Sequence, residues 1–229
     1  MRIEKPSMLF RRHAFGSRHR MVALAVGVAL SLCGCTEASE GKKPTGVSAE
    51  QVCDGALDAE GAGALMRLSG AENFEELSGE NDAGEPNKFS LVRAARHLHD
   101  RVGVRSSCKI YRAGSGDFPV VAIDFVASEY SLKPSGGQRP ETLLFDVGDY
   151  AAVSKNGALL YFKCATKGSA GSFIGDTSYV KGEMTSTSLG DRDPRDRMAI
   201  LNSLARAVAE EVGCAAEANL PVKVPSPSA

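Results

Sequence analysis

Four cysteines spread widely along the chain are the residues whose type most clearly predicts chemistry. They are Cys53, Cys108, Cys164 and Cys214. An even number of cysteines is typical of disulfide bonds in an exported protein. No Cys-x-x-Cys string and no neighbouring histidine accompany them, which disfavours a zinc site or catalytic thiols. Four cysteines allow three pairings. We favour Cys53–Cys108 and Cys164–Cys214, because each then joins a helix end to a strand within one half of the chain.

His97 and His99 are the only histidines beyond the first 35 residues. Two residues apart, they would share one face of a strand and could bind a metal together. The apolar spacing over residues 91–102 instead predicts a helix. There the two side chains would point about 200° apart, because each residue advances ~100°. We therefore expect two surface histidines and no metal site.

Ser106 and Lys109 match the Ser-x-x-Lys string of penicillin-binding enzymes. On a strand the two side chains would point to opposite faces, and the Lys-Thr-Gly string of those enzymes is absent. We interpret the match as coincidence. Gly-x-Ser-x-Gly, Gly-x-Gly-x-x-Gly and Walker A strings are also absent, so no nucleophile elbow or nucleotide site is indicated. The sequence therefore identifies no catalytic residue and no cofactor.

The first 34 residues are typical of an export signal. Residues 1–20 contain six basic side chains and one acid, and residues 21–34 are uncharged and mostly apolar. A basic segment followed by a short apolar one is the layout of a secretory signal peptide. A helix that spans ~30 Å of hydrocarbon needs about 20 apolar residues, and this stretch is shorter. Arg11 and Arg12 leave both general and twin-arginine export open.

The string Leu32-Cys33-Gly34-Cys35 resembles the lipobox of bacterial lipoproteins. The resemblance implies cleavage before Cys35 and a diacylglyceryl group, carrying chains such as palmitate, on its thiol. Cys33 is a poorer candidate, because the bulky Leu32 precedes it. Plain secretion, with cleavage near Ala38, is the alternative. Two acyl chains hold a protein stably at a membrane. We therefore expect a lipid anchor on the outer face of the cytoplasmic membrane.

The charge balance limits the expected partners. The full chain has a formal net charge of −1, from 27 basic and 28 acidic residues. Six of the basic residues and one acid lie in the signal, so the mature chain is more acidic. That balance disfavours a nucleic-acid partner. The expected partners are the membrane, through the lipid, and an envelope protein or a small-molecule ligand.

Capping residues and apolar spacing predict four helical segments. They are a short helix from Ser48 that contains Cys53, then helices from Asp58 to Gly70, from Ser90 to Gly103 and from Asp193 to Gly213. Residues 35–47 are polar and small, which predicts a flexible tether. The acidic segment 71–87 lacks the calcium-loop pattern and is interpreted as a solvated loop. Residues 215–229, with three prolines and no periodicity, predict a disordered tail.

Alternating apolar residues predict about five strands. They lie near 104–112, 119–127, 142–153, 158–166 and 178–187. Asn156-Gly157 is the strongest hairpin signal in the chain. Helices, then antiparallel strands, then a helix indicate the α+β class. We expect a single domain over residues 48–214, with a mostly antiparallel sheet of about five strands and helices packed on it.

This layout resembles the small, disulfide-containing lipoproteins of unknown function that are common in actinobacteria, the DUF3558-like group. The residues that carry the resemblance are Cys35, Val52-Cys53-Asp54, Ser107-Cys108, Phe162-Lys163-Cys164 and Gly213-Cys214. The resemblance implies an envelope location and an α/β sandwich, and no known reaction. We expect a membrane-anchored extracytoplasmic lipoprotein that acts as a non-enzymatic binding or accessory module. An envelope hydrolase with an unrecognised site is the alternative.

Overall fold

The structure is a computed structural model that describes residues 46–81, 84–115, 118–133, 142–187 and 193–228. The predicted signal over residues 1–34, Cys35 and most of the tether lie outside the described residues. Val47, which we expected in the tether, already belongs to the folded part. Its backbone amide and carbonyl each form a 2.9 Å hydrogen bond with Phe74. The expected boundary after residue 47 is therefore too late.

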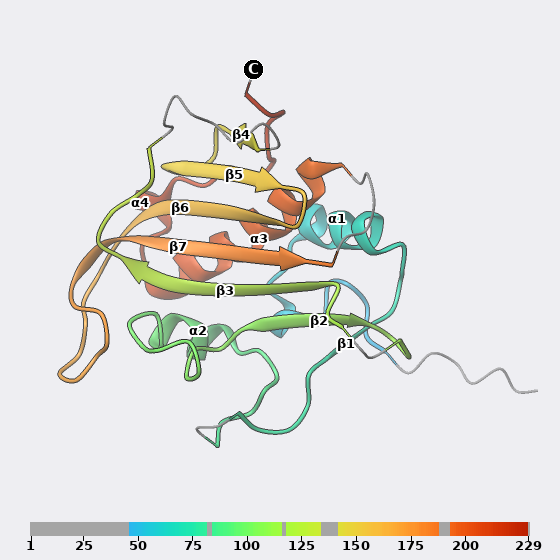
Figure 1. The fold of residues 1–229 in the computed structure, drawn as a ribbon, viewed down its shortest axis with the longest axis horizontal. Coiled ribbons are helices and arrows are strands. Elements are labelled where there is room, and N and C mark those ends of the chain that lie inside the picture. Colours follow the sequence, from blue (N-terminus) through green and yellow to red (C-terminus); the bar gives the residue numbers. More distant parts are fainter. Residues whose placement is uncertain (1–45, 82–83, 116–117, 134–141, 188–192, 229) are drawn as a thin grey trace, which may run out of the picture. The chain divides into compact units, whose positions relative to one another are not determined.

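Seven strands of the described ranges form one antiparallel sheet in the order β1-β2-β3-β7-β6-β5-β4 (Figure 1). Their bounds are β1 Phe74–Glu76, β2 Cys108–Arg112, β3 Val121–Ser128, β4 Leu143–Phe145, β5 Tyr150–Ser154, β6 Gly157–Thr166 and β7 Thr177–Ser186. The α+β class and the single domain are confirmed. The expected number of five strands is wrong.

The two additional strands have separate physical origins. β1 lies in the acidic segment that we interpreted as a loop, and only Phe74 among its three residues is buried. Such a short strand gives no alternating pattern to detect. The strand expected over 142–153 is two strands, β4 and β5, joined by a turn. Gly148 in this turn has a φ of 62°, a backbone conformation that glycine adopts at low cost.

The predicted hairpin joins β5 to β6. Ser154 lies opposite Gly157, so the two turn residues are Lys155 and Asn156. Gly157 is the first residue of β6, where a Cβ atom would collide with the carbonyl oxygen of Met184 on β7. The glycine of the Asn-Gly pair thus serves the close packing of β6 on β7.

Helices pack on one face of the sheet (Figure 1). Their bounds are η1 Cys53–Gly55, α1 Ala59–Ser69, α2 Leu91–Arg96, α3 Pro194–Val212 and α4 Ala215–Ala218. α1 and α3 begin and end where the capping residues predicted. Asp58 Oδ1 accepts a 2.9 Å hydrogen bond from the amide of Gly61, and Gly70 and Gly213 close the two helices in the left-handed conformation.

Two helices differ from their predictions. The segment from Ser48 forms a turn and then the short 3₁₀ helix η1, in which Cys53 and Asp54 have positive φ angles of 52° and 63°. α2 ends at Arg96, well before Gly103. The carbonyl oxygens of Leu98 and His99 accept hydrogen bonds from Ala127 and Ile174. They are therefore not available to continue the helix.

The core lies between the helices and the inner face of the sheet. Every second residue of β3 from Val121 to Ala127 is buried, the period expected of a sheet covered on one side. α3 contributes fully buried side chains along its length, including Ile200, Leu204 and Val208. The sheet and α3 together therefore hold α1 and the C-terminal segment in fixed positions.

The segment expected to be a disordered tail is folded over its described residues, 215–228. It contains α4, and the side chain of Val224 is only 1% exposed. The carbonyl oxygen of Pro221 accepts a 2.8 Å hydrogen bond from Asn202 Nδ2, and the amide of Ser228 donates one to Leu144. One buried valine and a few backbone contacts leave no periodic pattern in the sequence, which is why the prediction failed.

Candidate functional site

The four cysteines form the two disulfides that we favoured. Cys53 and Cys108 join η1 to the first residue of β2, with Cα atoms 5.5 Å apart. Cys164 and Cys214 join β6 to the residue after the cap of α3, with Cα atoms 5.3 Å apart. All four side chains are buried. The bridges therefore connect the helices to the sheet inside the core.

Glu76 is a half-buried carboxyl close to the first disulfide. It lies opposite Ile110 in the β1–β2 ladder. Cys108 is two residues before Ile110 on β2, so its side chain lies on the same face of the sheet as Glu76. Burial raises the pKa of Glu76, and the backbone amides of Cys53 and Phe89 oppose the rise. Its Oε1 atom is buried with no hydrogen-bond partner among the described residues. Sequence patterns gave no signal for this residue.

The two histidines occupy different environments. His97 caps α2, and its Nδ1 atom lies 2.6 Å from Asp100 Oδ2. His99 is only 7% exposed, so our expectation of a surface histidine is wrong there. Its ring nitrogens lie 3.1 Å from the carbonyl oxygen of Ile174 and 3.0 Å from Thr166 Oγ1. Within the described ranges, no group of three or more His, Cys, Asp or Glu residues is placed to hold a metal ion.

Ser106 and Lys109 do not form a catalytic pair in this structure. Both line one pocket of about 420 Å³. The hydroxyl of Ser106 is buried, however, and accepts a 3.1 Å hydrogen bond from the amide of Ser90, the cap of α2. Its visible role is to position the start of that helix.

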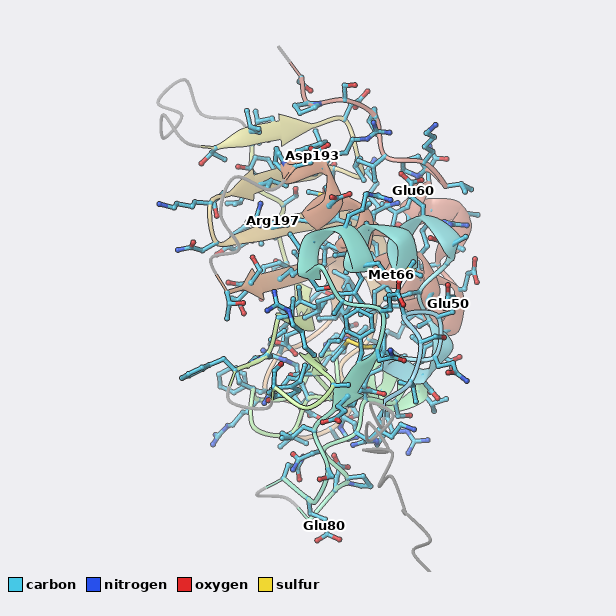
Figure 2. All side chains as sticks on the ribbon, turned by 90° about the vertical axis from the view of Figure 1, so that its right-hand side faces the viewer. Glu50, Glu60, Met66, Glu80, Asp193 and Arg197 are labelled. Atoms are coloured by element: carbon cyan, nitrogen blue, oxygen red, sulfur yellow. A yellow bond between two sulfur atoms is a disulfide. The ribbon has the colours of Figure 1, made fainter. Side chains whose placement is uncertain are left out.

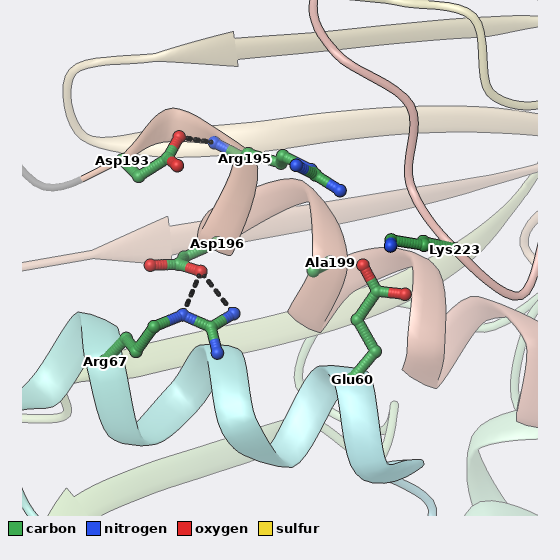
Figure 3. Close-up of a pocket in the computed structure, with 7 residues that line it drawn as sticks. All are labelled: Glu60, Arg67, Asp193, Arg195, Asp196, Ala199 and Lys223. Carbon is green, nitrogen blue, oxygen red and sulfur yellow. Dashed lines mark hydrogen bonds and ion pairs between the residues drawn. The ribbon is translucent and has the colours of Figure 1, made fainter.

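A strongly charged pocket lies between α1, the first turns of α3 and the segment after α4 (Figure 3). Its volume is about 460 Å³. The residues that line it are Glu60, Arg67, Asp193, Arg195, Asp196, Ala199 and Lys223. They come from α1, from α3 and from the segment after α4, which meet only in the folded domain. Sequence reasoning identified only Asp193 among them, as a helix cap, and did not predict the pocket. A side view shows Glu60 and Asp193 at this end of the domain, with Glu80 far away (Figure 2).

Two acidic side chains of the pocket already accept hydrogen bonds from other residues of the domain. Asp196 Oδ1 accepts hydrogen bonds from Arg67 Nε at 2.9 Å and from Arg67 Nη2 at 2.7 Å. Asp193 Oδ1 accepts a 2.9 Å hydrogen bond from the amide of Arg195 and caps α3. These contacts fasten α1 to α3 and complete the helix end.

Three other charges in the pocket have no ion-pair partner in the described part of the chain. They are Glu60, Arg195 and Lys223, whose charged ends point toward one another above Ala199 (Figure 3). Arg195 Nε donates a 3.2 Å hydrogen bond to the carbonyl oxygen of Val224, which fixes the guanidinium group. Two cations and one carboxylate thus converge in one pocket without an ion pair to another described residue.

Comparisons of the chain with protein-family models, with curated proteins and with solved structures find no match. Among the helices of the described ranges, none has the length and apolar character needed to cross a bilayer. The sequence and the geometry above are therefore the basis of the functional proposal.

Proposed function

We propose that this protein is a membrane-anchored extracytoplasmic lipoprotein that acts as a non-enzymatic binding or accessory module of the cell envelope. The observation that carries the proposal is the pairing of all four cysteines beyond Cys35 with one another. Disulfides are typical of oxidising compartments outside the cytosol. The same pairing leaves Cys35 without a disulfide partner among these cysteines, as a lipidated cysteine requires.

The pocket between α1 and α3 supports a binding role. Unpaired charged side chains that converge in a pocket of about 460 Å³ are groups that a ligand could satisfy. The pocket lies on helices that the disulfide Cys164–Cys214 and the Arg67–Asp196 pair hold in place. A rigid support of this kind favours recognition over a surface that must first be ordered.

The hydrolase alternative would gain support from perturbed carboxyls that converge in a pocket. Glu76, whose pKa is raised by burial, lies opposite Ile110 on the inner face of β1. It is not among the residues that line the pocket between α1 and α3. We therefore propose the binding role and not a hydrolase.

Substitution of the lipobox cysteine tests the anchor. Cys35→Ser removes the thiol that would carry the lipid, and Cys33→Ser is the matched control within the same motif. We expect the Cys35→Ser protein to leave the membrane fraction or to accumulate as an uncleaved precursor, while the Cys33→Ser protein behaves as wild type. A Cys35→Ser protein that is normally processed and firmly attached would refute the proposal.

A further inference from the structure

We infer that the pocket between α1 and α3 binds a small zwitterion, a molecule that carries a carboxylate and an ammonium group close together, such as an amino acid. The inference rests on the proposed binding function and names the class of its ligand. It is carried by Glu60, Arg195 and Lys223, the three pocket charges without an ion-pair partner among the described residues.

The two cations call for an anionic group. Arg195 and Lys223 point into the same space above Ala199 (Figure 3). Like charges that share one small pocket repel each other, and an anionic ligand group placed between them would relieve this repulsion. Arg195 Nε is held by the carbonyl oxygen of Val224, and the two terminal nitrogens of the guanidinium remain for a ligand. A planar fork of this kind matches a carboxylate.

One buried residue positions both cations. The side chain of Val224 is only 1% exposed, and its carbonyl oxygen receives the hydrogen bond of Arg195. Lys223 is the preceding residue, so burial of Val224 also fixes the backbone from which the lysine extends. The guanidinium of Arg195 and the backbone of Lys223 are therefore placed by the same buried anchor. Such preorganisation lowers the entropy that binding would otherwise cost.

Glu60 adds the second requirement on the ligand. It extends from the first turn of α1 toward the two cations, and within the described ranges it has no ion-pair partner of its own (Figure 3). A simple anion placed between Arg195 and Lys223 would be repelled by this carboxylate. A ligand that also carries an ammonium group would instead donate hydrogen bonds to it. The charge pattern therefore selects a zwitterion over phosphate or a plain carboxylate.

The size and the floor of the pocket fit a small molecule. The volume of about 460 Å³ falls within the range of roughly 300–1,000 Å³ typical of ligand sites. Ala199 forms the floor between the charged groups, so a small side chain leaves the space open (Figure 3). The lining is mostly polar, and we expect a modest affinity, with a Kd between about 1 μM and about 1 mM.

Calorimetric titration of the purified full chain tests the inference. The zwitterionic probes are alanine, leucine and the dipeptide alanyl-alanine. Acetate, phosphate and ethylammonium carry one sign of charge each. We expect at least one zwitterion to bind at least about tenfold more tightly than every probe of one sign. Equal or tighter binding of acetate or phosphate would overturn the inference, and so would the failure of all three zwitterions to bind.

Charge-removing variants identify the site. Arg195→Gln and Glu60→Gln should each weaken zwitterion binding at least about tenfold, and Lys223→Gln provides a third variant with an exposed side chain in case either of the others unfolds. Lys163→Gln on β6, an exposed position away from the pocket, is the matched control. Unchanged binding in all three pocket variants would refute the assignment. The Cys35→Ser fractionation is independent of these titrations, so failure of the anchor and failure of the ligand class are distinguishable.

Discussion

Asp196 and Arg67 join the last long helix of the domain to its first. The two residues are 129 positions apart, and Asp196 Oδ1 accepts hydrogen bonds of 2.9 Å and 2.7 Å from Arg67. The side chain of Asp196 is 9% exposed, while that of Arg67 is 61% exposed. The carboxylate also lies in the first turn of α3, where a negative charge interacts favourably with the helix dipole.

Asp196→Asn should therefore destabilise the domain. Loss of the charge-assisted bonds at a largely buried acceptor is expected to cost about 1–3 kcal/mol in the free energy of unfolding. Urea titration measures the change. Lys181→Gln breaks the Lys181–Glu183 pair, whose carboxylate is 54% exposed, and should cost less than about 1 kcal/mol. Equal stability of the Asp196 variant and wild type would contradict a fastening role for this contact.

Two glycines of α1 give a matched test of how α1 packs on α3. A Cβ atom on Gly61 would lie 2.6 Å from Ser203 Cβ and 2.7 Å from its hydroxyl oxygen. That hydroxyl also accepts a 2.8 Å hydrogen bond from the amide of Asp58. A Cβ on Gly63 would meet only Nη1 of Arg67, at 3.3 Å.

Gly61→Ala should therefore lower the free energy of unfolding by about 1–3 kcal/mol through overpacking. Gly63→Ala should raise it by roughly 0.5–1 kcal/mol, because alanine favours the helix. Thermal unfolding of both variants measures the contrast. If both substitutions were stabilising, the result would contradict the close contact between α1 and α3 at Gly61 and Ser203.

Local signals in the sequence were sufficient for many elements. Capping residues such as Asp58 and Asp193, and the glycines that follow α1 and α3, placed the ends of these helices. Those signals act within a few residues of where they occur. The cysteine pairing was also predictable, because each bridge joins elements from the same half of the chain.

Features that depend on distant packing were not predictable. His99 is buried because the β6–β7 connection reaches it through Ile174, which lies 75 residues later. Val224 is buried although the sequence around it predicts a disordered tail. Glu60 and Arg195 share a pocket only after α1 has packed on α3. No spacing rule in a single sequence relates residues so far apart, so the candidate site came from the structure alone.

The C-terminal segment offers a second matched pair. Val224 is 1% exposed, whereas Val222 is 66% exposed. Val224→Ala should cost about 1–3 kcal/mol in the free energy of unfolding. Val222→Ala should change it by less than about 0.5 kcal/mol. Urea titration of both variants checks the difference. If neither variant changed the free energy of unfolding, the segment would not be packed on the domain. The disordered tail predicted from the sequence would then be correct.

Glu76 should make stability depend on pH. Burial raises the pKa of this carboxyl above its ordinary value of 4.5. The contribution of this carboxyl to the free energy of unfolding is therefore complete below its pKa in the unfolded chain. It is lost as the pH rises through the pKa in the folded protein. Glu76→Gln removes the buried charge, so the variant should gain stability relative to wild type on going from about pH 4 to about pH 7.

Urea titrations at the two pH values measure this change for Glu76→Gln. Glu75→Gln is the charge-matched control, because Glu75 is the neighbouring residue on the opposite face of β1. The free-energy difference between the Glu76 variant and wild type must shift with pH in the stated direction. A shift in the opposite direction would contradict a carboxyl destabilised by burial.

Mass spectrometry of the native protein, isolated from membranes and mapped without reduction, tests the lipid anchor and the disulfides together. We expect a mature chain that begins at Cys35 and carries a diacylglyceryl group there. We also expect peptides that link Cys53 to Cys108 and Cys164 to Cys214. A bare Cys35 together with four free thiols would contradict both the location and the way the domain is held together.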